Sequence, residues 1–145
     1  MSEIRKCQVL IIGAGPGGYV AAIRSAQLGL ETIVVEGDKP GGVCLNIECI
    51  PSKAIIHAAE RYESLTKHSS ENGHMGISIN ENPEIDMKGV VEWKDGIVGR
   101  LTKGVETLVK SSGAELINGW ATFTSSKQCS VKTKEGEILI EAENV

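Results

Sequence analysis

Two cysteines five residues apart are the part of this sequence best suited to chemistry. Cys44 and Cys49 are followed by Pro51 and Lys53. On a regular helix the Cα atoms of such a pair would lie roughly 8 to 9 Å apart, whereas a disulfide needs less than about 7 Å. We therefore expect a distorted turn, because Pro51 lacks the N–H that would bond to the Ile47 carbonyl. A disulfide across a strained turn opens readily to reductant, and the Lys53 cation favours a thiolate at Cys49.

A glycine-rich segment at 13–18 carries the second chemical signal, the pattern G-x-G-x-x-G. Gly13 permits a tight turn, Gly15 lets a pyrophosphate approach the backbone, and Gly18 lets the next helix lie close to the strand. That helix offers its unpaired N-terminal N–H groups to the phosphates. Glu36, eighteen residues after Gly18, could accept hydrogen bonds from a ribose diol and would repel a 2′-phosphate. The pattern predicts dinucleotide binding but does not choose between NAD and FAD.

The elements expected around these groups alternate between strand and helix. Apolar runs at 7–12 and 32–35 predict two buried parallel strands, joined by a helix that ends at Gly29. Residues 44–68 predict a second helix. Asp86 is the expected N-cap of a long third helix, which ends before Gly113.

The rest of the chain predicts further strands. Residues 114–117 suit a third core strand, and 69–83 suit a loop with a short extended piece at 76–79. Three alternating segments predict an antiparallel meander: 121–124, 128–133 and 137–140. The expected fold is α/β, with a parallel βαβ core over 4–118 and a three-stranded β-meander over 119–145.

Composition narrows the classes of protein. The 145 residues are enough for one domain, and 41% hydrophobic with 23% charged residues is typical of a globular chain. A net charge of −4 disfavours nucleic acid as a partner, and no apolar run reaches the length of a membrane span or has the form of a signal peptide. Cys7 and Cys129 suit buried strand positions, and four dispersed cysteines do not form a secreted disulfide framework. We expect a reducing cytoplasm.

Residues 41–53 (Gly-Gly-Val-Cys-Leu-Asn-Ile-Glu-Cys-Ile-Pro-Ser-Lys) strongly resemble the redox-active disulfide motif of the pyridine nucleotide–disulfide oxidoreductases. The Leu-Asn-Ile and Ile-Pro-Ser-Lys portions are similar to the dihydrolipoamide dehydrogenase branch of that family. The resemblance covers the whole chain and includes segments 11–19, 101–108 and 118–123.

The resemblance implies a Rossmann-like FAD-binding domain with the flavin ring over the Cys44–Cys49 disulfide. Cys49 would be the thiol beside the flavin, forming the charge-transfer thiolate, and Cys44 the interchange thiol that meets dihydrolipoamide. Lys53 would approach the flavin edge, and electrons would pass from dithiol to disulfide to FAD to NAD. The residues implied at FAD are Gly13, Gly15, Pro16, Gly17, Gly18, Glu36, Gly42, Val43, Cys44, Lys53 and Ala121 (a backbone contact).

The same resemblance implies partners and further domains. The partner would be dihydrolipoamide on the lipoyl domain of a 2-oxo acid dehydrogenase complex or of the glycine cleavage system, and the whole enzyme would be a homodimer. The NAD-binding and dimerisation domains, and a strand with an Ala-Thr-Gly turn after Val145, are not in this sequence. We therefore expect a piece of a longer enzyme that holds FAD weakly and cannot turn over alone.

Two positions depart from the family pattern. Glu48 stands where glycine is usual and should disfavour a thiolate at Cys49 by like charge, whereas Ala121 in place of glycine should be harmless. Glutathione or mercuric reductase, a metal module using Cys44, Cys49 and His57, and a non-catalytic dinucleotide- or partner-binding domain remain alternatives. We expect no metal site, and we expect His57, His68 and His74 to be ordinary surface or packing residues.

Overall fold

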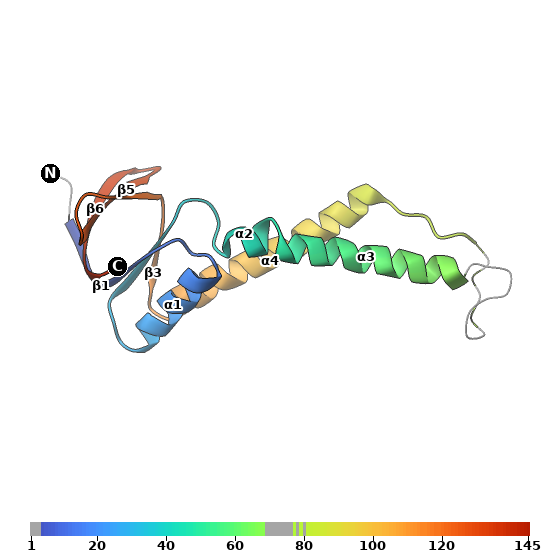
Figure 1. Ribbon diagram of the computed structural model, residues 1–145, viewed down its shortest axis with the longest axis horizontal. Helices are drawn as coiled ribbons and strands as arrows, with labels where there is room; N and C mark the ends of the chain where they lie inside the picture. The colour runs from blue at the N-terminus through green and yellow to red at the C-terminus, as the bar shows by residue number, and fades with distance from the viewer. Residues whose placement is uncertain (1–3, 69–76, 78, 80) are drawn as a thin grey trace.

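The computed structural model describes residues 4–68, 77, 79 and 81–145. It has a compact head, formed by the sheet and α1, from which α3 and α4 project side by side as a long arm (Figure 1). The helices are α1 (Pro16–Gln27), α2 (Gly42–Asn46), α3 (Cys49–His68) and α4 (Met87–Ser111). The strands are β1 (Ile4–Ile12), β2 (Thr32–Glu36), β3 (Glu115–Asn118), β4 (Trp120–Phe123), β5 (Gln128–Thr133) and β6 (Gly136–Asn144).

All described strands belong to one six-stranded sheet, in the order β3-β2-β1-β6-β5-β4. The first three pair in parallel, with Ile12 opposite Val35, and β4, β5 and β6 form the expected antiparallel meander. The α/β class, the parallel sheet and the meander are therefore confirmed.

β6 differs most from its predicted extent. Residues 137–140 were expected, but the strand continues to Asn144 because its other edge pairs in parallel with β1, from Ile4 opposite Leu139 to Val9 opposite Asn144. The meander is therefore joined to the parallel sheet by its own last strand.

Two apolar clusters lie on opposite faces of the sheet. One is covered by the meander and contains Cys7 and Cys129, both buried as predicted, and burial raises the pKa of each thiol. The other is covered by α1 and the C-terminal half of α4, with Ala22, Val34 and Val109 at its centre. These clusters hold the strand ends from which the glycine turn and Glu36 emerge.

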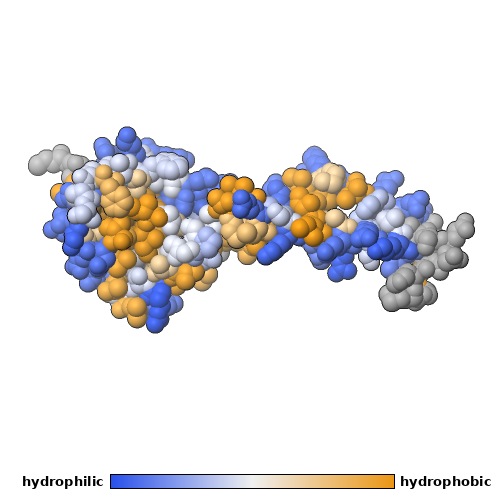
Figure 2. All heavy atoms as spheres, in the orientation of Figure 1, coloured by the Kyte–Doolittle hydropathy of each residue, from blue (hydrophilic) through white to orange (hydrophobic). Residues whose placement is uncertain are grey.

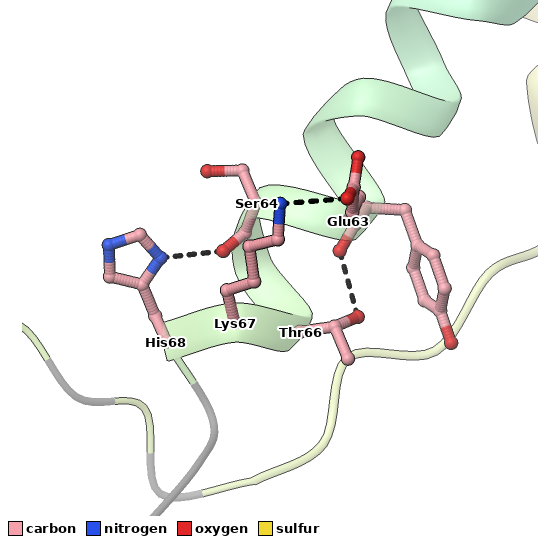
Figure 3. Close-up of polar contacts among 6 residues, drawn as sticks. Glu63, Ser64, Thr66, Lys67 and His68 are labelled. Atoms are coloured by element: carbon pink, nitrogen blue, oxygen red, sulfur yellow. Dashed lines mark hydrogen bonds and ion pairs between the residues drawn. The ribbon is translucent and has the colours of Figure 1, made fainter. Parts of the chain in front are cut away.

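The arm consists of two long helices. Asp86 is the N-cap of α4 as predicted, and its side chain accepts a hydrogen bond from the Lys88 N–H (3.0 Å). At the far end of α3 the contacts are between residues four apart: Lys67 with Glu63 (2.7 Å), Thr66 with the Tyr62 carbonyl, and His68 with the Ser64 carbonyl (Figure 3). The predicted loop at 69–83 and His74 fall largely or wholly outside the described residues.

The arm also carries exposed apolar side chains. Figure 2 shows apolar surface over the helices as well as over the head. The larger exposed residues of the arm are Ile55, Ile56, Tyr62, Leu65, Met87, Val91, Trp93 and Leu101. In the part of the chain that is described, no helix is both long and apolar enough to cross a membrane.

Candidate active site

The glycine turn lies between the end of β1 and the start of α1. Gly13 has a φ of +93° and donates its N–H to the Val35 carbonyl (2.8 Å), which holds the turn against the end of β2. A Cβ on Gly18 would lie 1.8 Å from the Gly13 carbonyl oxygen, so only glycine allows the helix to lie this close to the strand. Two of the roles predicted from the glycine pattern therefore have a direct steric basis here.

The space in front of the turn suits a phosphate group. A Cβ on Gly15 would have only the Gly42 Cα at 4.0 Å, and one on Gly17 would meet nothing within 4 Å. α1 starts at Pro16, whose missing N–H costs nothing at that position. The twelve-residue helix thus presents its N-terminus and an uncrowded backbone at the same place, which is the arrangement that binds pyrophosphate.

Glu36 lies at the end of β2 and is half-buried. Its Oε2 accepts a hydrogen bond from the Ala14 N–H (2.7 Å), and its Oε1 accepts one from the Asp38 N–H (2.9 Å). The sequence predicted the ribose contact of this carboxylate but not its bond to the turn. Each carboxylate oxygen has a second lone pair, so Glu36 can brace the turn and still accept a ribose hydroxyl.

The cysteine segment packs directly on the glycine turn. Gly41 donates its N–H to the Ala14 carbonyl (2.8 Å), and a Cβ on Gly42 would lie 2.8 Å from the Gly15 Cα. Gly42 also has a φ of +61°. The two motifs, separate in sequence, are therefore held together by backbone contacts, with Cys44 two residues beyond the contact.

The predicted single helix at 44–68 is wrong, because the structure divides it between the two cysteines. α2 ends at Asn46, Ile47 has φ −123° and ψ −41°, and α3 begins at Cys49. The N–H groups of Ile47 and Glu48 both donate to the Val43 carbonyl (2.9 Å each), which closes α2. Pro51 falls in the first turn of α3, where a missing N–H is tolerated. The expected distortion between the cysteines thus takes the form of a complete helix break.

The break brings the two thiols into contact. Both cysteines are free and half-buried, and the Cys44 thiol donates a hydrogen bond to the side chain of Cys49. This bond is the main cause that raises the pKa of the Cys44 thiol above its ordinary value; partial burial, Cys49 and Glu48 act in the same direction, and the Lys53 cation opposes them. Lys53 and Glu48 therefore act on the Cys44 thiol in opposite directions, and their predicted effects on Cys49 stay predictions.

Asn46 positions this segment and was not recognised from the sequence. Its side-chain amide donates to the carbonyls of Pro40 (3.1 Å) and Gly42 (3.0 Å), and its Oδ1 accepts from the Thr102 hydroxyl (2.9 Å). One side chain thus joins the loop before α2, α2 itself and α4. The residues next to Asn46 in the sequence do not indicate this role, because its partner Thr102 is 56 residues away.

The other predicted residues lie at varying distances from this centre. Val43 and Lys53 are exposed on α2 and α3 beside the cysteines. Ala121 lies on β4 opposite Val131, and its side chain packs against the core under the meander. The ring of His57 stacks on that of Trp93, with centroids 6.3 Å apart. No group of three or more possible metal ligands occurs among the described residues.

A large cleft of about 1200 Å³ lies beside these groups, between the ends of β2 and β4 and one side of α4. Gly37, Asp38 and Trp120 line its head side, and Thr102 with Asn46 line its arm side. The lining of the cleft begins at Gly37, immediately after Glu36, and does not include the glycine turn.

The chain is similar in sequence to known proteins over most of its length. The family model described as pyridine nucleotide-disulphide oxidoreductase matches residues 7–144. The chain is 50% identical over 136 residues to a dihydrolipoyl dehydrogenase of Pseudomonas aeruginosa, covering 94% of this chain and 29% of that protein. It is 53% identical over 119 residues to the dihydrolipoyl dehydrogenase of Geobacillus stearothermophilus, covering 82% of this chain and 24% of the relative.

Among solved structures, the Cu(II) complex of the HOCl-induced flavoprotein disulfide reductase RclA from Escherichia coli has the same fold. The TM-score is 0.77 at 24% identity, over 95% of this chain and 27% of that one. The chain therefore spans less than a third of the length of these relatives.

Proposed function

This chain belongs to the pyridine nucleotide-disulphide oxidoreductase family, and from that premise we propose that it is the FAD- and disulfide-bearing part of a dihydrolipoyl dehydrogenase. The observation that carries the proposal is the contact of the Cys44 and Cys49 thiols at a helix break, which rests on the glycine turn through Gly42 and Gly15. The identity of 45 to 53% to dihydrolipoyl dehydrogenases supports the choice of substrate.

The residues present fit FAD. Gly15 and Gly17 leave open space at the N-terminus of α1 for the pyrophosphate, and Glu36 has lone pairs free for the ribose. Cys44 lies two residues beyond Gly42, whose backbone meets Gly15 at the turn, so the cysteines, Val43 and Lys53 are the residues that would hold the flavin end. When bound, FAD supplies the acceptor for the electron pair of the reduced cysteines.

The cysteine pair would exchange electrons with a dithiol in two steps. A thiolate of dihydrolipoamide attacks the sulfur of Cys44, and Cys49 leaves as a thiolate. The second substrate thiol then attacks the mixed disulfide, which releases Cys44 and the cyclic disulfide of lipoamide. Two electrons now reside on the pair, and the raised pKa of Cys44 keeps that residue as a protonated thiol after release.

In the complete enzyme the electron pair passes through FAD to NAD, and the substrate arrives on the lipoyl domain of a 2-oxo acid dehydrogenase complex or of the glycine cleavage system. NAD binding and homodimer formation would reside in the larger part of the relatives' length that this chain does not match. The 145-residue chain alone would form no NADH.

The test uses the complete polypeptide encoded by the gene, loaded with FAD and kept without oxygen. We expect dihydrolipoamide to change the flavin absorbance and to support NADH formation, and we expect Cys44→Ser and Cys49→Ser to abolish both. Cys7→Ala, which removes a buried thiol on the other face of the sheet, is the matched control and should keep the activity.

Failure of FAD to bind would overturn the proposal as a whole. Reduction by NADPH with glutathione disulfide or Hg²⁺ as the preferred acceptor would instead assign the chain to a glutathione or mercuric reductase of the same family.

A further inference from the structure

The indole of Trp120 is the aromatic group in the lining of the cleft beyond Glu36. The residue is 71% exposed, although it lies at the start of β4 and its backbone pairs with Lys132 of β5. One side of the ring rests on Gly37: a Cβ there would lie 2.9 Å from both Cδ2 and Cε2 of the indole. The ring is thus supported on one face and open on the other, in an orientation that only glycine at position 37 permits.

The position of this ring relative to the glycine turn is fixed by Glu36. The carboxylate of Glu36 accepts a hydrogen bond from Ala14 in the turn, and its backbone carbonyl accepts one from the Gly119 N–H (2.8 Å), immediately before Trp120. A dinucleotide with its pyrophosphate on the turn and its ribose at Glu36 must continue beyond Glu36. Gly37 and Trp120 line the start of the cleft at that point.

We propose that Trp120 is a positioning residue for the adenine of the bound dinucleotide, with the open face of the indole stacked on the base. The inference rests on the FAD binding proposed above and adds a residue that the glycine pattern does not contain. Stacking of a nucleobase on an aromatic side chain changes affinity by about 5- to 150-fold when the ring is removed. Gly37 has a supporting role, because it leaves the space in which the indole lies.

The direct test uses the complete polypeptide, purified without flavin, and measures binding of ADP and FAD by calorimetry. We expect Trp120→Ala to weaken both ligands by about 5- to 150-fold, and Trp120→Phe to restore most of the affinity because a flat ring is retained. Trp93→Phe is the matched control, since that indole stacks on His57 in the arm, and it should leave both affinities unchanged.

Tryptophan fluorescence provides a readout that a purely structural role would not move. ADP contains no flavin, so any quenching by ADP reports on the base itself. Quenching should persist in the Trp93→Phe protein and disappear in the Trp120→Phe protein.

A double-mutant cycle tests the pairing with Gly37. The Cβ of Gly37→Ala should displace the indole and weaken ADP binding when Trp120 is present, but should have little effect when Trp120→Ala is already in place. Equal ADP and FAD affinities in the wild-type and Trp120→Ala proteins, with no quenching from Trp120, would overturn the inference and leave the proposed function intact. A wild-type protein that binds neither ligand would overturn both.

Discussion

The glycine turn and the cysteine segment touch each other, yet different interactions hold them in place. The turn is anchored by the sheet, through the Gly13–Val35 bond and the Glu36–Ala14 bond. The cysteine segment belongs to no strand, and its five-residue helix is held by the Gly42 contact and by the side chain of Asn46. A nucleotide site can therefore be fixed by a local backbone pattern, whereas a redox pair on a short helix depends on side chains distant in the sequence.

The largest expected effect tests the rigidity of the turn. Gly18→Val would place side-chain carbon against the Gly13 carbonyl, where even a Cβ would be at 1.8 Å. We expect a loss of about 3 kcal/mol in the free energy of unfolding, measured by urea titration. Gly17→Ala is the control, because its Cβ enters open space on the same helix, and it should change stability by no more than about 1 kcal/mol. Equal stability of the two variants would contradict a sheet-anchored turn.

Asn46→Ala should have the next largest effect. It removes three hydrogen bonds that join residues 40–42 to α4, with an expected loss of about 2 kcal/mol. We also expect slower formation of the Cys44–Cys49 disulfide under mild oxidation, measured by counting free thiols over time. Unchanged oxidation kinetics would show that the helix break alone brings the cysteines together.

Thr102→Val sharpens the comparison by removing only one of those bonds. The hydroxyl that donates to Asn46 is lost, while the two bonds from Asn46 to the carbonyls of Pro40 and Gly42 can remain. The expected loss is about 1 kcal/mol, and the double variant with Asn46→Ala should be no less stable than Asn46→Ala alone. A fully additive double variant would mean that Thr102 stabilises α4 in some other way.

The smallest expected effect is on the reactivity of the Cys44 thiol rather than on the stability of the fold. Because the hydrogen bond with Cys49 is the main cause of the raised pKa of Cys44, Cys49→Ala should lower that pKa. A lower pKa means more thiolate at a given pH, so Cys44 should react faster with iodoacetamide near pH 8. The pH dependence of alkylation, followed by mass spectrometry, measures this effect, and Glu48→Gln should shift the profile in the same direction by less. A profile that moves to higher pH would contradict the hydrogen-bond assignment.

These differences also explain how much could be predicted from the sequence. The turn, Glu36 and the burial of Cys7 and Cys129 follow from short patterns whose partners are strands of predictable length. The helix break after Asn46 could not be located, because the segment around it is held by contacts between residues far apart in the sequence, Gly42 with Gly15 and Asn46 with Thr102. The support of Trp120 by Gly37 likewise appears only when β2 and β4 lie together.

β6 has a consequence for how the head unfolds. One of its edges belongs to the antiparallel meander and the other to the parallel layer, through pairs such as Cys7 with Ala142. Detaching this strand would expose both layers to water at once, so the head should melt as a single cooperative unit. Residues at the far end of the arm take no part in the strand pairing of the head. The backbone amides near His68 should therefore exchange with solvent well before those of β1.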